Sequence, residues 1–61
     1  MVKEGDVVEI VGGRKATVLK RKRGGRLVAS LGRTRKGESV AGVSGIVLLK
    51  PKVVYMVETW L

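Results

Sequence analysis

The chain has 61 residues, a net charge of +8 and 44% hydrophobic residues, so it is long enough for one small domain and too apolar for a disordered basic tail. It contains no Cys and no His, which excludes disulfides, zinc-finger ligation, a thiol nucleophile and an imidazole base. A domain of this size buries only about 60% of the surface that its unfolded chain exposes, so we expect a small core that gains stability from a partner or ligand.

The distribution of β-branched residues and glycines predicts the strands. Twelve Val, two Ile and three Thr favour strands over helices, and nine Gly divide the chain into short segments, which is typical of an all-β protein. The last predicted strand has a short helix or a dimer strand as its alternatives. In chain order, we predict strands at residues 7–11, 15–21, 26–31, 38–43, 46–50 and 53–60.

Glycine pairs mark the first two connections. The pairs Gly12-Gly13 and Gly24-Gly25 have access to the positive φ that tight hairpins require. Residues 32–37 are predicted to form a longer polar loop, because this segment is too highly charged to be buried.

The glycines and the proline in the last third of the chain are less regularly spaced. Gly42 and Gly45 predict a bulge, a sharp bend or another turn in the sheet. Pro51 cannot donate a hydrogen bond to a neighbouring strand, so it predicts a strand break or an edge.

Several predicted strands carry apolar residues on both faces over part of their length, as at Val7, Val8 and Ile10. A flat sheet would leave one of these faces in water, whereas a small closed barrel with covered ends, or a dimer, would bury more of it. We favour the barrel, because closure also removes the sheet edges that promote aggregation.

Positive charge is concentrated in residues 14–36. This window holds ten of the thirteen Lys and Arg and no Asp or Glu, while the other three cations and five carboxylates leave the rest of the chain at −2. Close packing of like charges destabilises a compact state, and a bound polyanion would offset that cost. The residues that we expect to contact nucleic acid are Arg14, Lys15, Lys20, Arg21, Lys22, Arg23, Arg26, Arg33, Arg35 and Lys36.

The basic window has two alternative roles, a solvated face and a membrane-binding surface. A solvated face needs no ligand at all. Membrane binding needs an amphipathic helix with apolar anchors, and the window has no helical period.

The sequence offers little for catalysis. The three Ser have no His to activate them, and the five carboxylates are scattered. Residues 32–37 have the spacing of a phosphate loop, but Glu38 stands where that motif needs Lys. Residues 42–45 have the G-x-x-G spacing of KH loops without the flanking helices or basic residues. We therefore expect no enzymatic activity, no cofactor and no metal site.

The residue types also predict how nucleic acid is bound. Phosphates are held without regard to sequence, whereas adenine is usually read by Asn or Gln, both absent here. Val28 and Leu31 are candidate wedges between base steps, although core packing is the preferred role for both. Tyr55 and Trp60, the two aromatics, are expected in the core or as end plugs. Few stacking platforms favour duplex DNA over single strands.

Residues 4–13 (EGDVVEIVGG), followed by Val18, resemble the opening of a KOW segment, with a Gly-Asp turn, an alternating strand, a Gly turn and a second strand. The family's pattern has a further Gly two places before the Val, where this chain has Ala16. The resemblance covers residues 4–20. It implies an SH3-like barrel and contacts with RNA, the ribosome or an elongation complex.

In size, charge and lack of Cys and His, the chain is also similar to the small basic chromatin proteins of archaea. Several of these proteins are SH3-like or OB-like barrels that coat DNA with little sequence preference. No diagnostic motif carries this similarity, which is one of composition. The lack of Asn, Gln and Cys agrees with a hot-living source.

We therefore expect residues 1–61 to form one all-β domain, an SH3-like or OB-like barrel of five to six short strands. Its expected function is to bind duplex DNA, with little sequence preference, as a monomer. The alternatives are an RNA-binding or ribosome-associated KOW-like protein and an interaction module for an acidic partner. With no signal-peptide-like run and no apolar stretch long enough to span a bilayer, we expect a cytoplasmic, nucleoid-associated protein.

Overall fold

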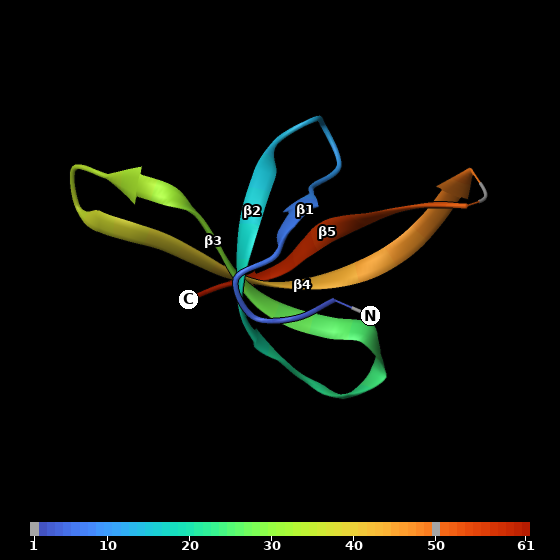
Figure 1. Cartoon of the computed structure of the whole chain (residues 1–61). Coiled ribbons are helices and arrows are strands. Elements are labelled where there is room, and N and C mark those ends of the chain that lie inside the picture. The colour runs from blue at the N-terminus through green and yellow to red at the C-terminus, as the bar shows by residue number, and fades with distance from the viewer. Residues whose placement is uncertain (1, 50) are drawn as a thin grey trace.

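The fold is a single antiparallel sheet of five strands in the order β1-β2-β3-β4-β5, seen in the computed structural model of the chain (Figure 1). The structure describes residues 2–49 and 51–61. A short 3-10 turn, η1 (Arg23–Gly25), connects the second and third strands. The strands are β1 (Val7–Glu9), β2 (Lys15–Arg21), β3 (Arg26–Thr34), β4 (Gly37–Leu49) and β5 (Lys52–Trp60).

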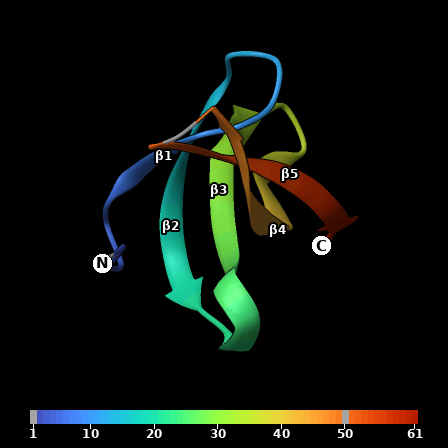
Figure 2. The ribbon, with the colours of Figure 1, turned by 90° about the vertical axis from the view of Figure 1, so that its right-hand side faces the viewer.

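The sheet curls into a half-barrel (Figure 2). After β1 the chain reaches the last strand, where Ile10 forms an isolated parallel bridge with Tyr55. The N–H of Val11 donates to the C=O of Tyr55 at 2.8 Å. The prediction of an all-β fold is therefore confirmed, and the curled sheet is consistent with a small SH3-like or OB-like barrel.

The core lies on the concave face of the sheet and is built from small side chains. Residues directly opposite each other in an antiparallel pair share a face, and the core follows such pairs, including Val18 opposite Ala29 and Leu27 opposite Val43. Val2, Leu31 and Val57 are partly buried against it. The buried cluster consists of Val8, Ile10, Ala16, Val18, Leu27, Ala29, Ala41, Val43 and Tyr55.

The glycine-pair connections have the expected backbone. Gly24 and Gly25 have φ of 72° and 76°, which is the left-handed region that a side chain disfavours. The N–H of Lys22 donates to the C=O of Arg26 at 2.8 Å and closes this turn. Gly12 and Gly13 also have positive φ, so both predicted tight turns are confirmed.

Two predicted boundaries are wrong at the first and third strands. The first strand ends at Glu9 and not at residue 11, because Ile10 already hydrogen-bonds to Arg14 and Gly13 in the following turn. The polar loop predicted at residues 32–37 is a tight turn at Arg35 and Lys36. The Thr34 hydroxyl stabilises that turn by donating to the C=O of Gly37 at 2.9 Å.

The predicted break in the fourth strand is also wrong. The sequence predicts separate strands at residues 38–43 and 46–50, but β4 runs without interruption through Gly42 and Gly45. The register against β5 does shift after Gly42, so the bulge alternative is the correct one. Its extra residue, Glu58, belongs to β5, since Thr59 and Val57 hold the adjacent pairs. The expected strand end at Lys50 lies outside the described residues.

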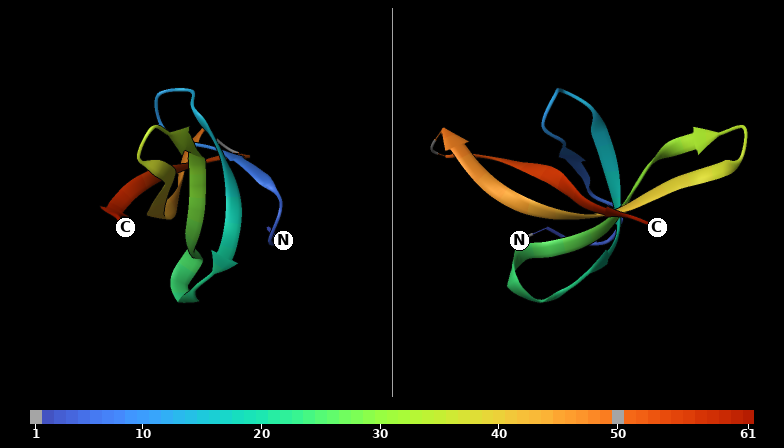
Figure 3. Two further views of the ribbon diagram at one scale, coloured as in Figure 1. Left: turned by 90° about the vertical axis from the view of Figure 1, so that its left-hand side faces the viewer. Right: turned by 180° about the vertical axis from the view of Figure 1, so that it is seen from behind.

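The last segment is a strand, as predicted, and it begins just after Pro51. The connections between β1 and β2, β2 and β3, and β3 and β4 project in different directions around the sheet (Figures 1 and 3). Within the described part of the chain, no helix has the length and apolar character needed to cross a membrane.

Candidate nucleic-acid interface

The ten basic residues of the window divide into two groups of five at opposite ends of β2 and β3. All ten are exposed. We call the residues near η1 the η1 group: Lys20, Arg21, Lys22, Arg23 and Arg26. We call those of the β1–β2 and β3–β4 hairpins the hairpin group: Arg14, Lys15, Arg33, Arg35 and Lys36.

The antiparallel topology is what separates the groups. The β1–β2 and β3–β4 connections lie toward one end of the sheet, and η1 lies at the other end (Figure 2). Lys15 and Arg21 bound β2, and six steps along a strand at about 3.3 Å each place them roughly 20 Å apart. A charge run that is continuous in sequence is therefore two separate charged ends in space.

A strip of small side chains lies between the two groups, on the convex face. Its registers are Thr17 opposite Ser30 and Val28 opposite Gly42. Because each pair shares a face, these residues lie side by side across β2, β3 and β4, where Ser30 is buried and the others are at least partly exposed. We call this surface the outer strip; its members are Thr17, Val28, Ser30, Val40, Gly42 and Ser44.

Lys20 and Arg26 flank the outer strip on the same face. Lys20 stands opposite Val28, and Arg26 stands opposite Ser44. Long cationic side chains beside small ones leave room for a phosphate backbone to approach the sheet. Lys20 and Arg26 therefore place positive charge beside the part of the outer strip that is nearest to η1.

Arg21 has a different orientation from its neighbours, because β2 contains a bulge. The register shifts between Val18 and Lys20, so Leu19 has no partner in β3. A bulge moves every later residue to the other face. Arg21 therefore stands opposite the buried Leu27, on the concave face, where its Nη1 donates to the C=O of Val2 at 3.3 Å.

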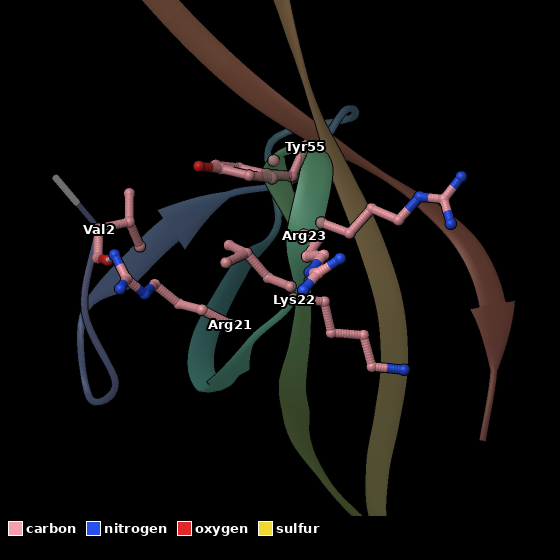
Figure 4. A pocket seen from close by; sticks show the side chains of 8 residues that line it. Val2, Arg21, Lys22, Arg23 and Tyr55 are labelled. Atoms are coloured by element: carbon pink, nitrogen blue, oxygen red, sulfur yellow. Dashed lines mark hydrogen bonds between the residues drawn. The ribbon is translucent and has the colours of Figure 1, made fainter.

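An open hollow of about 580 Å³ lies beside Arg21 at this end of the sheet (Figure 4). Four of the five residues of the η1 group contribute to it, and apolar side chains form the rest of its wall. The lining residues are Val2, Arg21, Lys22, Arg23, Gly25, Arg26, Leu27 and Tyr55.

Folding brings carboxylates from elsewhere in the chain close to residues 14–36, a segment that contains no Asp or Glu. Glu9 lies 3.6 Å from Nζ of Lys15 and 3.4 Å from Nζ of Lys52. Glu58 lies 3.6 Å from Nε of Arg26. These pairs are largely exposed, where ion pairs add little stability. Among the described residues, the other eight cations of the two groups form no salt bridge.

A buried hydroxyl fixes the bend in β3 that leads to Arg33. Ser30, which is buried, donates from Oγ to Oε2 of Glu38 at 2.9 Å and accepts from the N–H of Gly32 at 3.3 Å. The register shifts between Ser30 and Arg33, and Gly32 has φ of 111° there. Sequence reasoning missed the Ser30–Glu38 pair, since only the hairpin register brings the two side chains together.

The candidate wedges and aromatics have mixed outcomes. Val28 is half-buried on the convex face, so its expected core role is wrong, whereas Leu31 packs against the core. Tyr55 is a core residue with 9% exposure, as predicted. Trp60 is 58% exposed near the end of β5, so its expected role as a core or plug residue is wrong. After the bulge at Glu58, pairing resumes and Trp60 stands opposite the buried Ala41, so the exposure of Trp60 does not come from its register.

Comparison of the chain with protein-family models, curated proteins and solved structures finds no match.

Proposed function

We propose that this protein is a non-enzymatic DNA-binding protein that holds duplex DNA by its phosphates, with little sequence preference. The observation that carries the proposal is the division of ten exposed cations into the η1 and hairpin groups, with the outer strip between them. A nucleoid-associated role in compacting or protecting DNA follows from such binding.

The spacing of the groups supports a duplex ligand. A DNA groove is bordered by two phosphate backbones, about 12 Å apart in the major groove and about 6 Å in the minor groove. The groups are roughly 20 Å apart, and the length of Lys and Arg side chains is enough for the two groups to contact both backbones of one groove. A single strand has one backbone, so it would contact both groups only by running along the outer strip from one end of the sheet to the other.

The outer strip supports low sequence preference. Its polar side chains are the hydroxyls of Thr17, Ser30 and Ser44, and Ser30 already donates to Glu38. Hydroxyl groups contact several bases, whereas discrimination usually comes from bidentate Arg, Asn or Gln contacts. Val28 lies at the centre of the strip, where it remains a candidate wedge between base steps.

The test is a binding series of a blunt-ended DNA duplex from low to moderate salt. Each phosphate contact releases counterions, so log affinity should fall linearly with log salt at about −0.9 per contact. Two unrelated duplex sequences should give the same line within experimental error. The absence of a salt slope would overturn the proposal.

A competition experiment separates DNA from RNA. Matched duplex DNA and structured RNA compete for the protein at one salt concentration, and the proposal expects the DNA to displace the RNA. Stronger binding of the RNA would favour a ribosome-associated or other RNA-binding role. A nuclease-resistant complex with an acidic protein, in the absence of DNA binding, would favour an interaction module.

A further inference from the structure

The hollow beside η1 has a chemistry of its own within the basic surface. Eight of the described residues line it: four are Lys or Arg, and none of the eight is Asp or Glu. Arg21, Lys22 and Arg23 form no salt bridge among the described residues, whereas Arg26 pairs with Glu58. The hollow is therefore positive at its rim, which favours an anion.

The wall of the hollow is apolar. Val2, Leu27 and the ring of Tyr55 line it, and Figure 4 shows the Tyr55 ring between Val2 and Arg21 on one side and Arg23 on the other. The hydrogen bonds among the described residues do not include the Tyr55 hydroxyl, which points toward the Val2 side in that view. The hollow thus combines an apolar wall, a phenol hydroxyl and a cationic rim.

The bulge at Leu19 is what gives the hollow its central cation. Without the shift between Val18 and Lys20, Lys20 would stand opposite Leu27 and Arg21 would leave the concave face. In the observed register, Arg21 hydrogen-bonds to the backbone of Val2 and so holds the N-terminal segment beside the hollow. A planar guanidinium in this position is suited to contact phosphate oxygens in pairs.

We propose that this hollow binds one nucleotide unit, with its phosphate among Arg21, Lys22 and Arg23 and its base against Val2, Leu27 and Tyr55. A volume of about 580 Å³ exceeds what a bare phosphate needs and lies in the range of small-molecule sites. The lining has no amide or carboxylate side chain, the groups that usually read adenine and cytosine, so adenine and cytosine nucleotides bind about equally. The inference rests on the proposed function, because it takes an unpaired nucleotide of nucleic acid as the natural source.

The experiment titrates the protein with AMP, CMP, adenosine and inorganic phosphate and follows backbone amide shifts by NMR. AMP and CMP should bind with similar affinity and shift the amides of Val2, Gly25 and Leu27. Adenosine and inorganic phosphate should each bind about tenfold more weakly or worse, since each lacks one half of the contacts. Equal binding of phosphate and AMP would overturn the nucleotide assignment, as would shifts located elsewhere.

Two variants with the same charge change locate the site. Val2→Glu places a carboxylate beside Arg21 and should weaken AMP binding about tenfold or more. Val47→Glu changes an exposed residue of β4 that does not line the hollow, and should leave AMP binding unchanged. Tyr55→Phe keeps the ring in the core and should weaken AMP by several-fold, through loss of one hydrogen bond. Equal effects of the two Glu variants would overturn the proposal.

Binding measurements with two DNA duplexes distinguish a nucleotide within DNA from a free nucleotide. They also separate this inference from the proposed function. A duplex with a 5′-phosphorylated single-stranded overhang should bind more tightly than the same duplex with blunt ends, and Val2→Glu should remove that advantage. Equal binding of both duplexes would assign the site to free nucleotides only and overturn the nucleic-acid source. Blunt-duplex binding without any nucleotide binding would overturn this inference and leave the proposed function standing. Nucleotide binding without any binding of the blunt duplex would overturn the proposed function.

Discussion

Gly45 and Tyr55 stand directly opposite each other in β4 and β5, and the glycine leaves the space that the tyrosine ring occupies. A Cβ atom on Gly45 would lie 3.2 Å from Cε2 of Tyr55 and 3.4 Å from Cγ1 of Val53. The same tyrosine accepts the hydrogen bond from Val11 that joins the two ends of the half-barrel. The side chain missing at Gly45 therefore allows the sheet to curl around the ring.

Replacing Gly45 by Ala should destabilise the protein. The added methyl group is overpacked against a core residue, which typically costs about 1–3 kcal/mol. Thermal unfolding measures the effect, at about 4–8 °C in Tm per kcal/mol for a domain of this size. Gly42→Ala is the matched control, because its Cβ would lie 3.8 Å or more from its neighbours. A larger loss at Gly42 than at Gly45 would contradict the packing argument.

Ser30→Ala should loosen the bend in β3. It removes the donor to Glu38 and the acceptor for Gly32, and loss of partners at a part-buried site costs about 1–3 kcal/mol. Denaturant unfolding gives the free energy, and amide exchange at Gly32 should accelerate. Ser44→Ala, at a half-buried position of the outer strip, should change stability by less than about 0.5 kcal/mol. Equal losses would indicate that the Ser30 hydrogen bonds add nothing.

The two ends of the sheet should contribute separately to duplex binding. The double variants K20A/R26A and R33A/R35A each remove two exposed cations, one pair from each group. Each should reduce the magnitude of the salt slope by about 1.8, and the quadruple variant by about 3.6. Fluorescence anisotropy with two unrelated duplexes should show the same weakening for both.

The control for the charge variants is K3A/K52A, which removes two exposed cations outside the two groups. It should lower the net charge by two, as the other double variants do, and leave the salt slope nearly unchanged. An equal reduction in slope would mean that net charge, and not the placement of the cations, determines binding. Loss of binding to only one of the duplexes would instead indicate base recognition.

Trp60 should behave as a solvent-exposed tryptophan in the folded protein. It is 58% exposed, and it is the only Trp in the chain, so its fluorescence reports one site. Acrylamide should quench it in the native state almost as efficiently as in denaturant. Strong protection in the native state would contradict the exposed end of β5, and a dimer covering this end would reveal itself by concentration-dependent quenching.

Local features of the sequence account for the elements. β-branched residues and paired glycines predict an all-β chain, the bounds of β2 and the two glycine turns, because strand propensity and positive φ depend on few neighbours. The prediction of a strand break at Gly42 and Gly45 is wrong, because the role of these glycines depends on residues that are distant in the sequence. A glycine in a strand also serves to admit a facing ring, and Tyr55 lies ten residues further along the chain.

The sequence by itself determined the class of fold and the concentration of basic residues at positions 14–36, since both follow from residue type and order. Only the tertiary structure decided how those cations are arranged. The antiparallel topology separates them into two ends, the bulge at Leu19 turns Arg21 to the concave face, and the pairing of strands brings Glu9 and Glu58 beside Lys15 and Arg26. Register is a property of pairs of strands, so a single extra residue changes the face of a side chain without leaving a signal in local sequence.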